Sequence, residues 1–231
     1  MSGCRGWVLH RRPYRESSAL VDLLLADRGR VRAVARGVHG HKSRLAQLLQ
    51  PFTPLDLALT GRGELATLGR AESDGPPLLL TGEPLLCAFY LNELLLRLLP
   101  QEEECAALLA AYEQALAGLA AGEAVEQQLR PFELALLAHL GFAVDWQQDG
   151  HGYPVRAEQT YHFLPAEGWV AGGRPAQQVA GASLLAMVDE GSPHWWPAAR
   201  HCLRLMLDAL LGERPLQSRV LLRQQRQRSK R

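Results

Sequence analysis

Short apolar runs that alternate with polar residues fill the first third of the chain. Over residues 5 to 72, Gly and Pro interrupt these runs every few positions, as is typical of β-strands joined by turns. Turn-forming residues at 27–29 and 60–63 mark two of the connections. The pattern predicts five strands, at Gly6–Arg11, Ser18–Ala26, Arg30–Arg36, Pro54–Thr60 and Glu64–Ala71.

A short helical segment, Lys42–Leu49, is predicted between the third and fourth strands and is stopped by Pro51. Five short strands with a small helix at this place form the layout of an OB-fold, a barrel that often binds single-stranded nucleic acid. An SH3-like barrel is also built from short strands of this kind, and it is the alternative fold at this point.

The third predicted strand has a strict period of two. Its apolar residues, Val31, Ala33 and Ala35, point to one face, because successive side chains of a strand alternate between faces. The opposite face receives arginines, namely Arg30, Arg32 and Arg36. We therefore expect one face of this strand to pack in the barrel and the other to be cationic.

Helical patterns dominate after the Ser73–Pro77 segment, whose Gly and Pro residues indicate a domain boundary. A small hairpin is predicted from Tyr161–Leu164 and Gly168–Val170. The predicted helices are Leu85–Leu99, Glu102–Ala121, Glu123–Leu140, Gln177–Glu190, Trp195–Leu211 and Ser218–Gln227. The expected fold is thus α+β, with a barrel domain at 1–75 and a mainly helical domain at 76–231 that ends in a basic tail.

The most apolar stretch, Pro84–Leu99, is too short to cross a bilayer and contains charged residues. The N-terminus reaches arginines after three apolar residues and lacks the central region of a secretion signal. Four scattered cysteines form no disulfide framework or metal-ligand spacing, which favours a reduced, cytoplasmic compartment.

Charge is segregated along the 231 residues, although the net charge is only +1. Residues 1–70 hold 12 Lys and Arg against 5 Asp and Glu, whereas 71–213 hold 6 against 19. The last segment, 214–231, holds 7 basic residues and no acidic one. Attraction to a polyanion acts within a Debye length of about 10 Å, so two local excesses of positive charge indicate phosphate-rich partners.

Further basic residues of the N-terminal domain are predicted to join those of the third strand in binding DNA; they are Arg11, Arg12, Arg15, Arg28, Lys42 and Arg44. Among the aromatic residues, Tyr14 lies in a turn and is the best candidate for stacking on a base. We expect Trp7 and Phe52 to belong to the core instead.

Signatures of catalysis are incomplete. The Gly37–Ser43 segment ends in Lys-Ser, but His41 stands where a phosphate-binding loop needs Gly. His39 and His41, or Asp145 with Asp149 and His151, lack the further ligands of a metal site. We therefore expect no catalytic residue, no metal and no cofactor.

Motifs spread over nearly the whole chain resemble those of the RecO family of bacterial recombination mediators. Their order and spacing together are specific. They are Gly6–Leu9, Arg12–Ser18, Ala35–Gly37, Lys42–Leu45, Leu49–Phe52, Tyr90–Leu94, Leu129–Leu134, Leu140–Phe142 and Pro215–Arg219.

This resemblance implies an N-terminal OB-fold, a helical C-terminal domain and a function without bond cleavage. Such proteins bind single- and double-stranded DNA, anneal complementary strands, engage the C-terminal tail of single-stranded DNA-binding protein, and with RecR help to load RecA. A cytoplasmic, nucleoid-associated location would follow. Some relatives carry a four-cysteine zinc site, but this chain has no cysteine between Val144 and Tyr161.

An acidic protein tail that ends in a carboxylate suits a groove edged by arginines, because guanidinium can hold a carboxylate at two places. Arg130 is the first candidate for this site, followed by Arg200 and Arg204, which are four residues apart on one helix. The alternative is that these arginines pair with nearby glutamates. An alternative for the whole chain is an RNA-binding OB-fold protein with a helical interaction domain.

Overall fold

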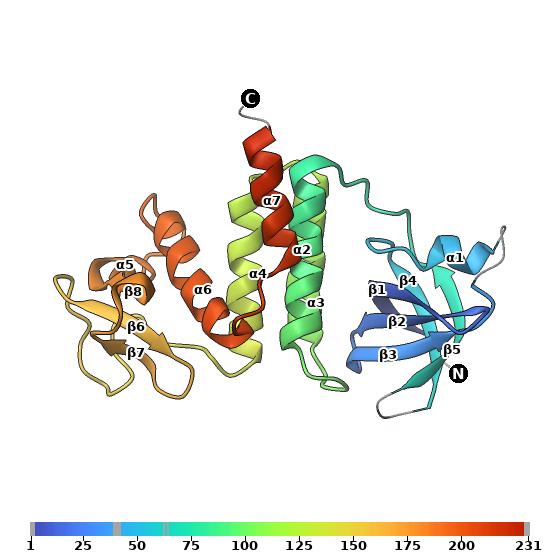
Figure 1. Ribbon diagram of the computed structural model, residues 1–231, viewed down its shortest axis with the longest axis horizontal. Coiled ribbons are helices and arrows are strands. Elements are labelled where there is room, and N and C mark those ends of the chain that lie inside the picture. The colour runs from blue at the N-terminus through green and yellow to red at the C-terminus, as the bar shows by residue number, and fades with distance from the viewer. Residues whose placement is uncertain (1–2, 39–42, 62, 64, 229–231) are drawn as a thin grey trace. The chain divides into compact units, whose positions relative to one another are not determined.

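The computed structural model describes residues 3–38, 43–61, 63 and 65–228. The chain forms two compact units, Met1–Glu123 together with Leu216–Arg231, and Ala124–Pro215 (Figure 1). Helices that follow the barrel, and the last helix of the chain, thus belong to the same unit as the barrel. The expected domain boundary after residue 75 stays a prediction.

The barrel is a closed five-stranded sheet with the order β1-β2-β3-β5-β4, in which β4 pairs with β1. Neighbouring strands are antiparallel except for β3 and β5, which are parallel. The strands are β1 (Cys4–Tyr14), β2 (Ser18–Leu25), β3 (Gly29–Ala35), β4 (Leu55–Thr60) and β5 (Ala66–Ser73). This arrangement confirms the predicted OB-fold.

Burial along β3 follows the predicted alternation, with Val31, Ala33 and Ala35 fully inside. The short helix α1 (Arg44–Leu48) packs Leu45 and Leu48 against the same apolar core. Trp7 and Phe52 are 3% and 5% exposed, which confirms that they are core residues.

The barrel unit also contains α2 (Gly82–Leu98), α3 (Ala106–Ala120) and α7 (Gln217–Arg228). The prediction that the second helix begins at Glu102 was wrong. Glu102 has a φ of 59° and its backbone N–H donates to the carbonyl of Arg30 at 3.0 Å, so this segment lies along β3 instead of coiling. The bond to a distant strand decides the local conformation.

Buried polar contacts join α2 and α3 to the barrel. The side-chain amide of Asn92 donates to the carbonyl of Leu9 at 2.9 Å and accepts a hydrogen bond from the Tyr112 hydroxyl at 2.7 Å. The indole N–H of Trp7 donates to Glu113 at 2.8 Å. Asn92, Tyr112 and Trp7 thereby find partners for their polar groups, and these bonds fix the helices on β1.

The second unit contains α4 (Val125–His139), a sheet of order β7-β6-β8, the short helix α5 (Gly181–Ala186) and α6 (Trp195–Leu211). Strand β6 (Thr160–Leu164) and β7 (Gly168–Ala171) form the predicted hairpin.

The predicted helix at Gln177–Glu190 was wrong in its first part. Residues Pro175–Gln177 form a 3-10 turn and Gln178–Ala180 form β8, which pairs with β6. Val179 is buried as a strand residue, because the sheet supplies pairing partners that the local pattern does not reveal.

Within the part of the chain that the structure describes, no helix is both long and apolar enough to span a membrane.

Candidate nucleic-acid interface

The strand register brings several predicted DNA-binding residues to one end of the barrel. Pro13 of β1 lies opposite Ala19 of β2, which in turn lies opposite Ala35 of β3. The β1–β2 turn and the end of β3 therefore meet, and the backbone N–H of Val38 donates to the Ser17 carbonyl. The start of α1 joins them through Ser43, whose hydroxyl donates to the Gly37 carbonyl at 3.0 Å.

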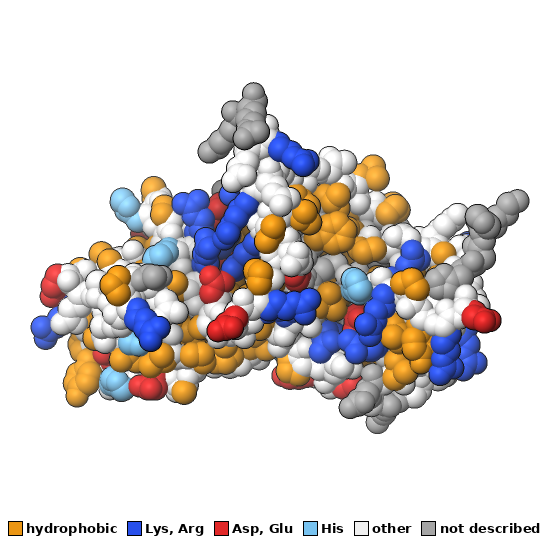
Figure 2. Space-filling model, in the orientation of Figure 1, with side chains coloured by type: hydrophobic (Ala, Val, Ile, Leu, Met, Phe, Trp, Pro, Cys, Tyr) orange, Lys and Arg blue, Asp and Glu red, His pale blue; other side chains and the backbone are white. Residues whose placement is uncertain are grey.

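Four exposed arginines surround this end; we call Arg12, Arg15, Arg36 and Arg44 the arginine rim. Over the described residues, the rim arginines form no ion pair with a carboxylate. Figure 2 shows Lys and Arg side chains gathered over the barrel. Glu16 is also exposed here and reduces the local positive excess by one charge.

Tyr14 is half-buried beside the rim, and the guanidinium of Arg15 lies 5.0 Å from the centre of its ring. Arg15 itself has a φ of 54°, which turns the chain sharply between β1 and β2. The predicted stacking role of Tyr14 stays a prediction, with Arg15 covering one part of the ring.

Arg11 and Lys42 differ from the rim. The guanidinium of Arg11 donates to the carbonyl of Ala46 at 2.7 Å and so holds α1 on the barrel. Lys42 lies outside the described residues, as do His39 and His41.

Arg28 and Arg30 lie toward the opposite end of the barrel and Arg32 lies midway along β3; all three have partners inside the unit. Arg28 forms an ion pair with Glu102, and Arg30 donates to the carbonyl of Leu99 at 2.7 Å. Arg32 lies 3.0 Å from Asp22, whose side chain is 5% exposed. Burial lowers the pKa of Arg30, while Asp22 opposes this effect.

These partners explain why the eight described arginines of the predicted set divide into two groups, four at the rim and four that are held by partners. Asp22 lies opposite Arg32 on the neighbouring strand, ten residues away in the sequence, whereas Glu102 and the Leu99 carbonyl come from a segment about 70 residues after Arg28 and Arg30. Sequence reasoning therefore missed the residues that neutralise or hold Arg28 and Arg30. The accessible positive charge is concentrated at the rim.

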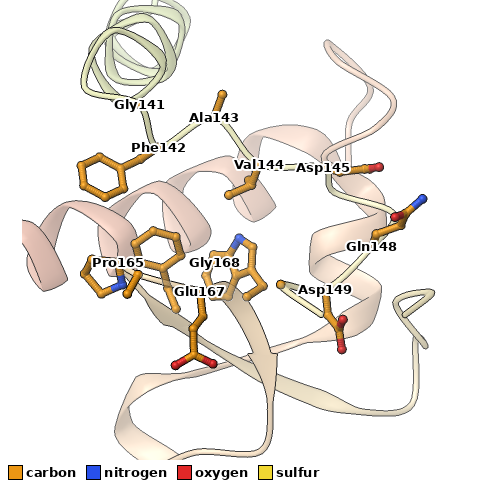
Figure 3. A pocket seen from close by; sticks show the side chains of 14 residues that line it. Gly141, Phe142, Ala143, Val144, Asp145, Gln148, Asp149, Pro165, Glu167 and Gly168 are labelled. Atoms are coloured by element: carbon orange, nitrogen blue, oxygen red, sulfur yellow. The ribbon is translucent and has the colours of Figure 1, made fainter. Parts of the chain in front are cut away.

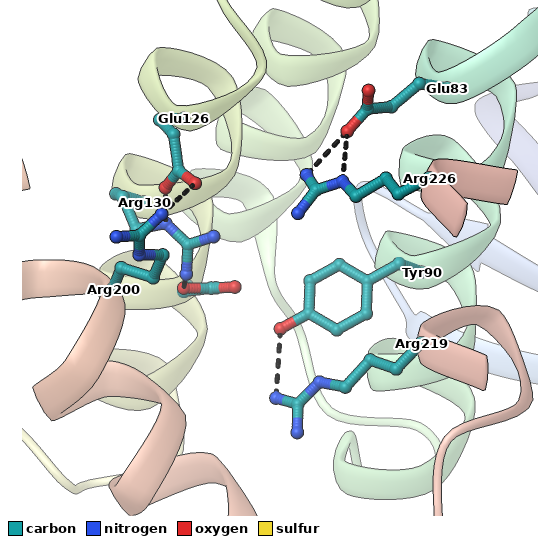
Figure 4. A network of polar contacts seen from close by, with 8 residues as sticks. Glu83, Tyr90, Glu126, Arg130, Arg200, Arg219 and Arg226 are labelled. Atoms are coloured by element: carbon teal, nitrogen blue, oxygen red, sulfur yellow. Dashed lines mark hydrogen bonds and ion pairs between the residues drawn. The ribbon is translucent and has the colours of Figure 1, made fainter. Parts of the chain in front are cut away.

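The predicted tail-binding arginines all lie in the second unit, and Figure 4 shows Arg130 and Arg200 beside Glu126. Arg130 has a side chain that is 9% exposed and forms ion pairs with the fully buried Glu133 and, at 2.9 Å, with Glu126. Arg200 also reaches Glu126, at 3.8 Å, but is 62% exposed.

Arg204 lies one turn further along α6 and is 52% exposed, with Asp208 at 3.5 Å. Arg200 and Arg204 are therefore accessible to a partner, whereas Arg130 is occupied by two carboxylates.

A pocket of about 320 Å³ in the second unit is lined by apolar side chains that include Phe142, Val144 and Trp169. Figure 3 shows the carboxylates of Asp145 and Glu167 pointing away from these apolar groups. The remaining acid, Asp149, accepts hydrogen bonds from the backbone of its own loop. The acidic groups thus order loops and do not converge on a ligand.

Across the described residues, no three His, Cys, Asp or Glu side chains are placed to hold a metal ion. Aromatic rings pack together beside the loop that contains Trp146: the ring centre of Trp169 lies 5.4 Å from that of Phe163 and 6.4 Å from that of Trp146. This packing provides contacts that hold the loop against β6 and β7.

Comparison with known proteins identifies both halves of the chain. Residues 1–75 match the family model described as "Recombination protein O N terminal", and residues 80–227 match "Recombination protein O C terminal". The chain belongs to the RecO family. This confirms the resemblance noted in the sequence.

Relatives within the RecO family are similar over almost their full length. A protein of Nitrosococcus oceani is 43% identical over 226 residues, which cover 95% of this chain and 92% of the relative. One of Pseudomonas paraeruginosa is 44% identical over 222 residues, covering 93% and 92%, and one of Pseudoalteromonas atlantica is 41% identical over 227 residues, covering 95% and 93%. All three are named DNA repair protein RecO, and these names state no catalysed reaction.

Proposed function

We propose that this chain is a DNA repair and recombination mediator that binds single- and double-stranded DNA through the arginine rim and anneals complementary strands. It acts by association and without bond cleavage, as a cytoplasmic, nucleoid-associated protein. The observation that carries the proposal is the set of four exposed arginines at one end of a closed OB-fold barrel. The names of the relatives support the repair role.

Annealing requires two polyanions to approach each other. A surface of guanidinium groups lowers their mutual repulsion, because each group bound to a phosphate releases condensed counterions. Contacts to phosphates carry no information on base identity, so the binding is independent of sequence. Arg15 and Tyr14 add a planar surface on which a base can stack.

Partner binding in this proposal involves the second unit. The acidic tail of single-stranded DNA-binding protein contacts Arg200 and Arg204, whose guanidinium groups are accessible. Arg130 supports this surface by orienting Glu126, which both Arg130 and Arg200 contact. RecR binding and help in loading RecA onto coated DNA complete the proposed role.

Annealing of complementary oligonucleotides coated with single-stranded DNA-binding protein tests this function directly. We expect the chain to accelerate annealing, and to lose this effect when the coating protein lacks its tail. The variant R200Q/R204Q should resemble the tail deletion while binding free DNA normally. Annealing of coated strands that is no faster than without the chain would contradict the proposal.

The RNA-binding alternative is tested in the same assay, because phosphate contacts alone do not separate RNA from DNA. Matched DNA and RNA strands compete for the chain, and a clear preference for RNA together with no annealing of DNA would favour the alternative.

A further inference from the structure

The C-terminal helix α7 carries the second basic excess of the chain. Residues 217–231 contain Arg and Lys but no Asp or Glu. The helix belongs to the same compact unit as the barrel, although about 140 residues separate it from the end of β5. Its charge therefore adds to the unit that carries the arginine rim.

Three contacts dock α7 on α2 and orient it. The carboxylate of Glu93 accepts hydrogen bonds from the backbone N–H groups of Gln217 and Ser218, at 2.8 and 2.9 Å, and from the Ser218 hydroxyl. The guanidinium of Arg219 lies 5.4 Å from the Tyr90 ring centre, and Arg226 pairs with Glu83 at 2.5 Å (Figure 4).

Docking in this orientation leaves a polar face exposed. Arg223, Gln224, Gln227 and Arg228 are all exposed, and their spacing places 223 beside 227 and 224 beside 228. Over the described residues, neither Arg223 nor Arg228 contacts a carboxylate. The face thus offers two guanidinium and two amide groups, which are the side chains that commonly bind phosphate oxygens.

We propose that this face of α7 is a second phosphate-binding surface, which holds nucleic acid in addition to the arginine rim. The inference rests on the proposed function and extends it to residues at the far end of the sequence. Its occupant is a nucleic-acid backbone, since the face is cationic and rich in hydrogen-bond donors, and Leu221 is the only exposed large apolar side chain among the described residues of α7. Lys230 and Arg231 follow in the sequence and add to the positive charge.

The test is the variant R223Q/R228Q in the full-length chain, with R156Q/R174Q as a matched control that removes two exposed arginines from the other unit. Gln has a helix propensity close to that of Arg, so α7 should stay folded. Affinity for a fluorescein-labelled oligothymidylate is measured by anisotropy between about 50 and 200 mM salt.

We expect the slope of log K against log salt to become shallower by about 1.4 in R223Q/R228Q, because each lost contact to a single strand removes about 0.7. The same change made in a chain that already lacks the rim arginines should remove most of the remaining binding. The control variant should have the wild-type slope and the wild-type affinity.

Unchanged affinity and slope in both backgrounds would overturn the inference while leaving the rim intact. A wild-type chain without affinity for the oligothymidylate would instead overturn the proposed function itself. An oligoglutamate peptide is the second probe: loss of its binding in R223Q/R228Q, with DNA binding unchanged, would assign the face to an acidic protein and also overturn the inference.

Discussion

Arg130 and Glu133 form an ion pair in α4 where neither side chain has free access to water. Removing one partner of such a pair leaves the other charge buried, and the cost of this usually exceeds the value of the pair itself. Arg130 is therefore a structural residue first, although its residue type and position made it the leading candidate for a binding role.

Arg130→Ala should lower the free energy of unfolding by about 3 kcal/mol or more, because Glu133 is left buried with its charge uncompensated. The control Arg204→Ala removes an exposed arginine and should cost less than about 1 kcal/mol. Urea unfolding, monitored by circular dichroism, measures the free energy of unfolding of both variants. Equal stability of the two variants would show that the buried pair does not contribute in this way.

Two buried thiols predict the behaviour of the chain at high pH. Burial is the main cause that raises the pKa of Cys105 from 9.0 to about 11 and that of Cys202 from 9.0 to about 12. The folded state thus holds these protons more tightly than the unfolded state, so the contribution to stability is present below pH 9 and is lost as the pH rises toward 11–12.

Unfolding free energy should accordingly fall between about pH 9 and 11 in the wild-type chain, and Cys202→Ala should make this fall smaller. Urea titrations at a series of pH values measure the difference. An identical pH dependence in the two proteins would be inconsistent with a buried, protonated Cys202.

Helix α7 depends on a residue from another helix for its first turn. The first N–H groups of a helix have no partner within it, and a negative charge there also interacts favourably with the helix dipole. Glu93 of α2 supplies both effects, through contacts with Gln217 and Ser218 that span more than 120 residues of sequence.

Glu93→Ala should loosen α7 and lower stability by about 1–2 kcal/mol, as expected for loss of a charged cap. Amide hydrogen exchange in residues 217–228 should become faster. Glu83→Gln is the matched control, because it removes only the exposed partner of Arg226 and should leave exchange nearly unchanged. Equal exchange in both variants would argue against the cap.

The sequence predicted well those elements that are determined by residues close together in the chain. Alternation and turn residues located all five strands, and β3 buries the expected residues. The failures at Glu102 and at Gln177–Glu190 share a cause, since hydrogen bonds to distant strands decide the conformation there. Glu93 shows the same effect, because its role in capping α7 depends on tertiary placement.

The predicted DNA-binding set contains the rim, but the sequence could not separate the rim from the engaged arginines. Arg28 and Arg36 look alike in the sequence, yet one pairs with Glu102 and the other is exposed. The difference depends on which end of the barrel faces α2 and α3. Buried contacts, such as the hydrogen bond from Asn92 of α2 to the carbonyl of Leu9 in β1, determine which end of the barrel faces these helices.

For the molecule as a whole, charge is partitioned so that the barrel unit holds both basic segments while most acids lie in the segment between them. A net charge of +1 hides this partition. Local positive surfaces, and not the overall charge, should therefore control association with DNA and its dependence on salt.

The salt dependence of single-stranded DNA binding tests the central claim most directly. With about six phosphates neutralised, about four at the arginine rim and about two at α7, the slope of log K against log salt should be about −4.2 for the wild-type chain. Replacing the four rim arginines by glutamine in R12Q/R15Q/R36Q/R44Q should make the slope shallower by about 2.8. A wild-type slope near zero, or a variant with the wild-type slope and affinity, would contradict DNA binding by the arginine rim.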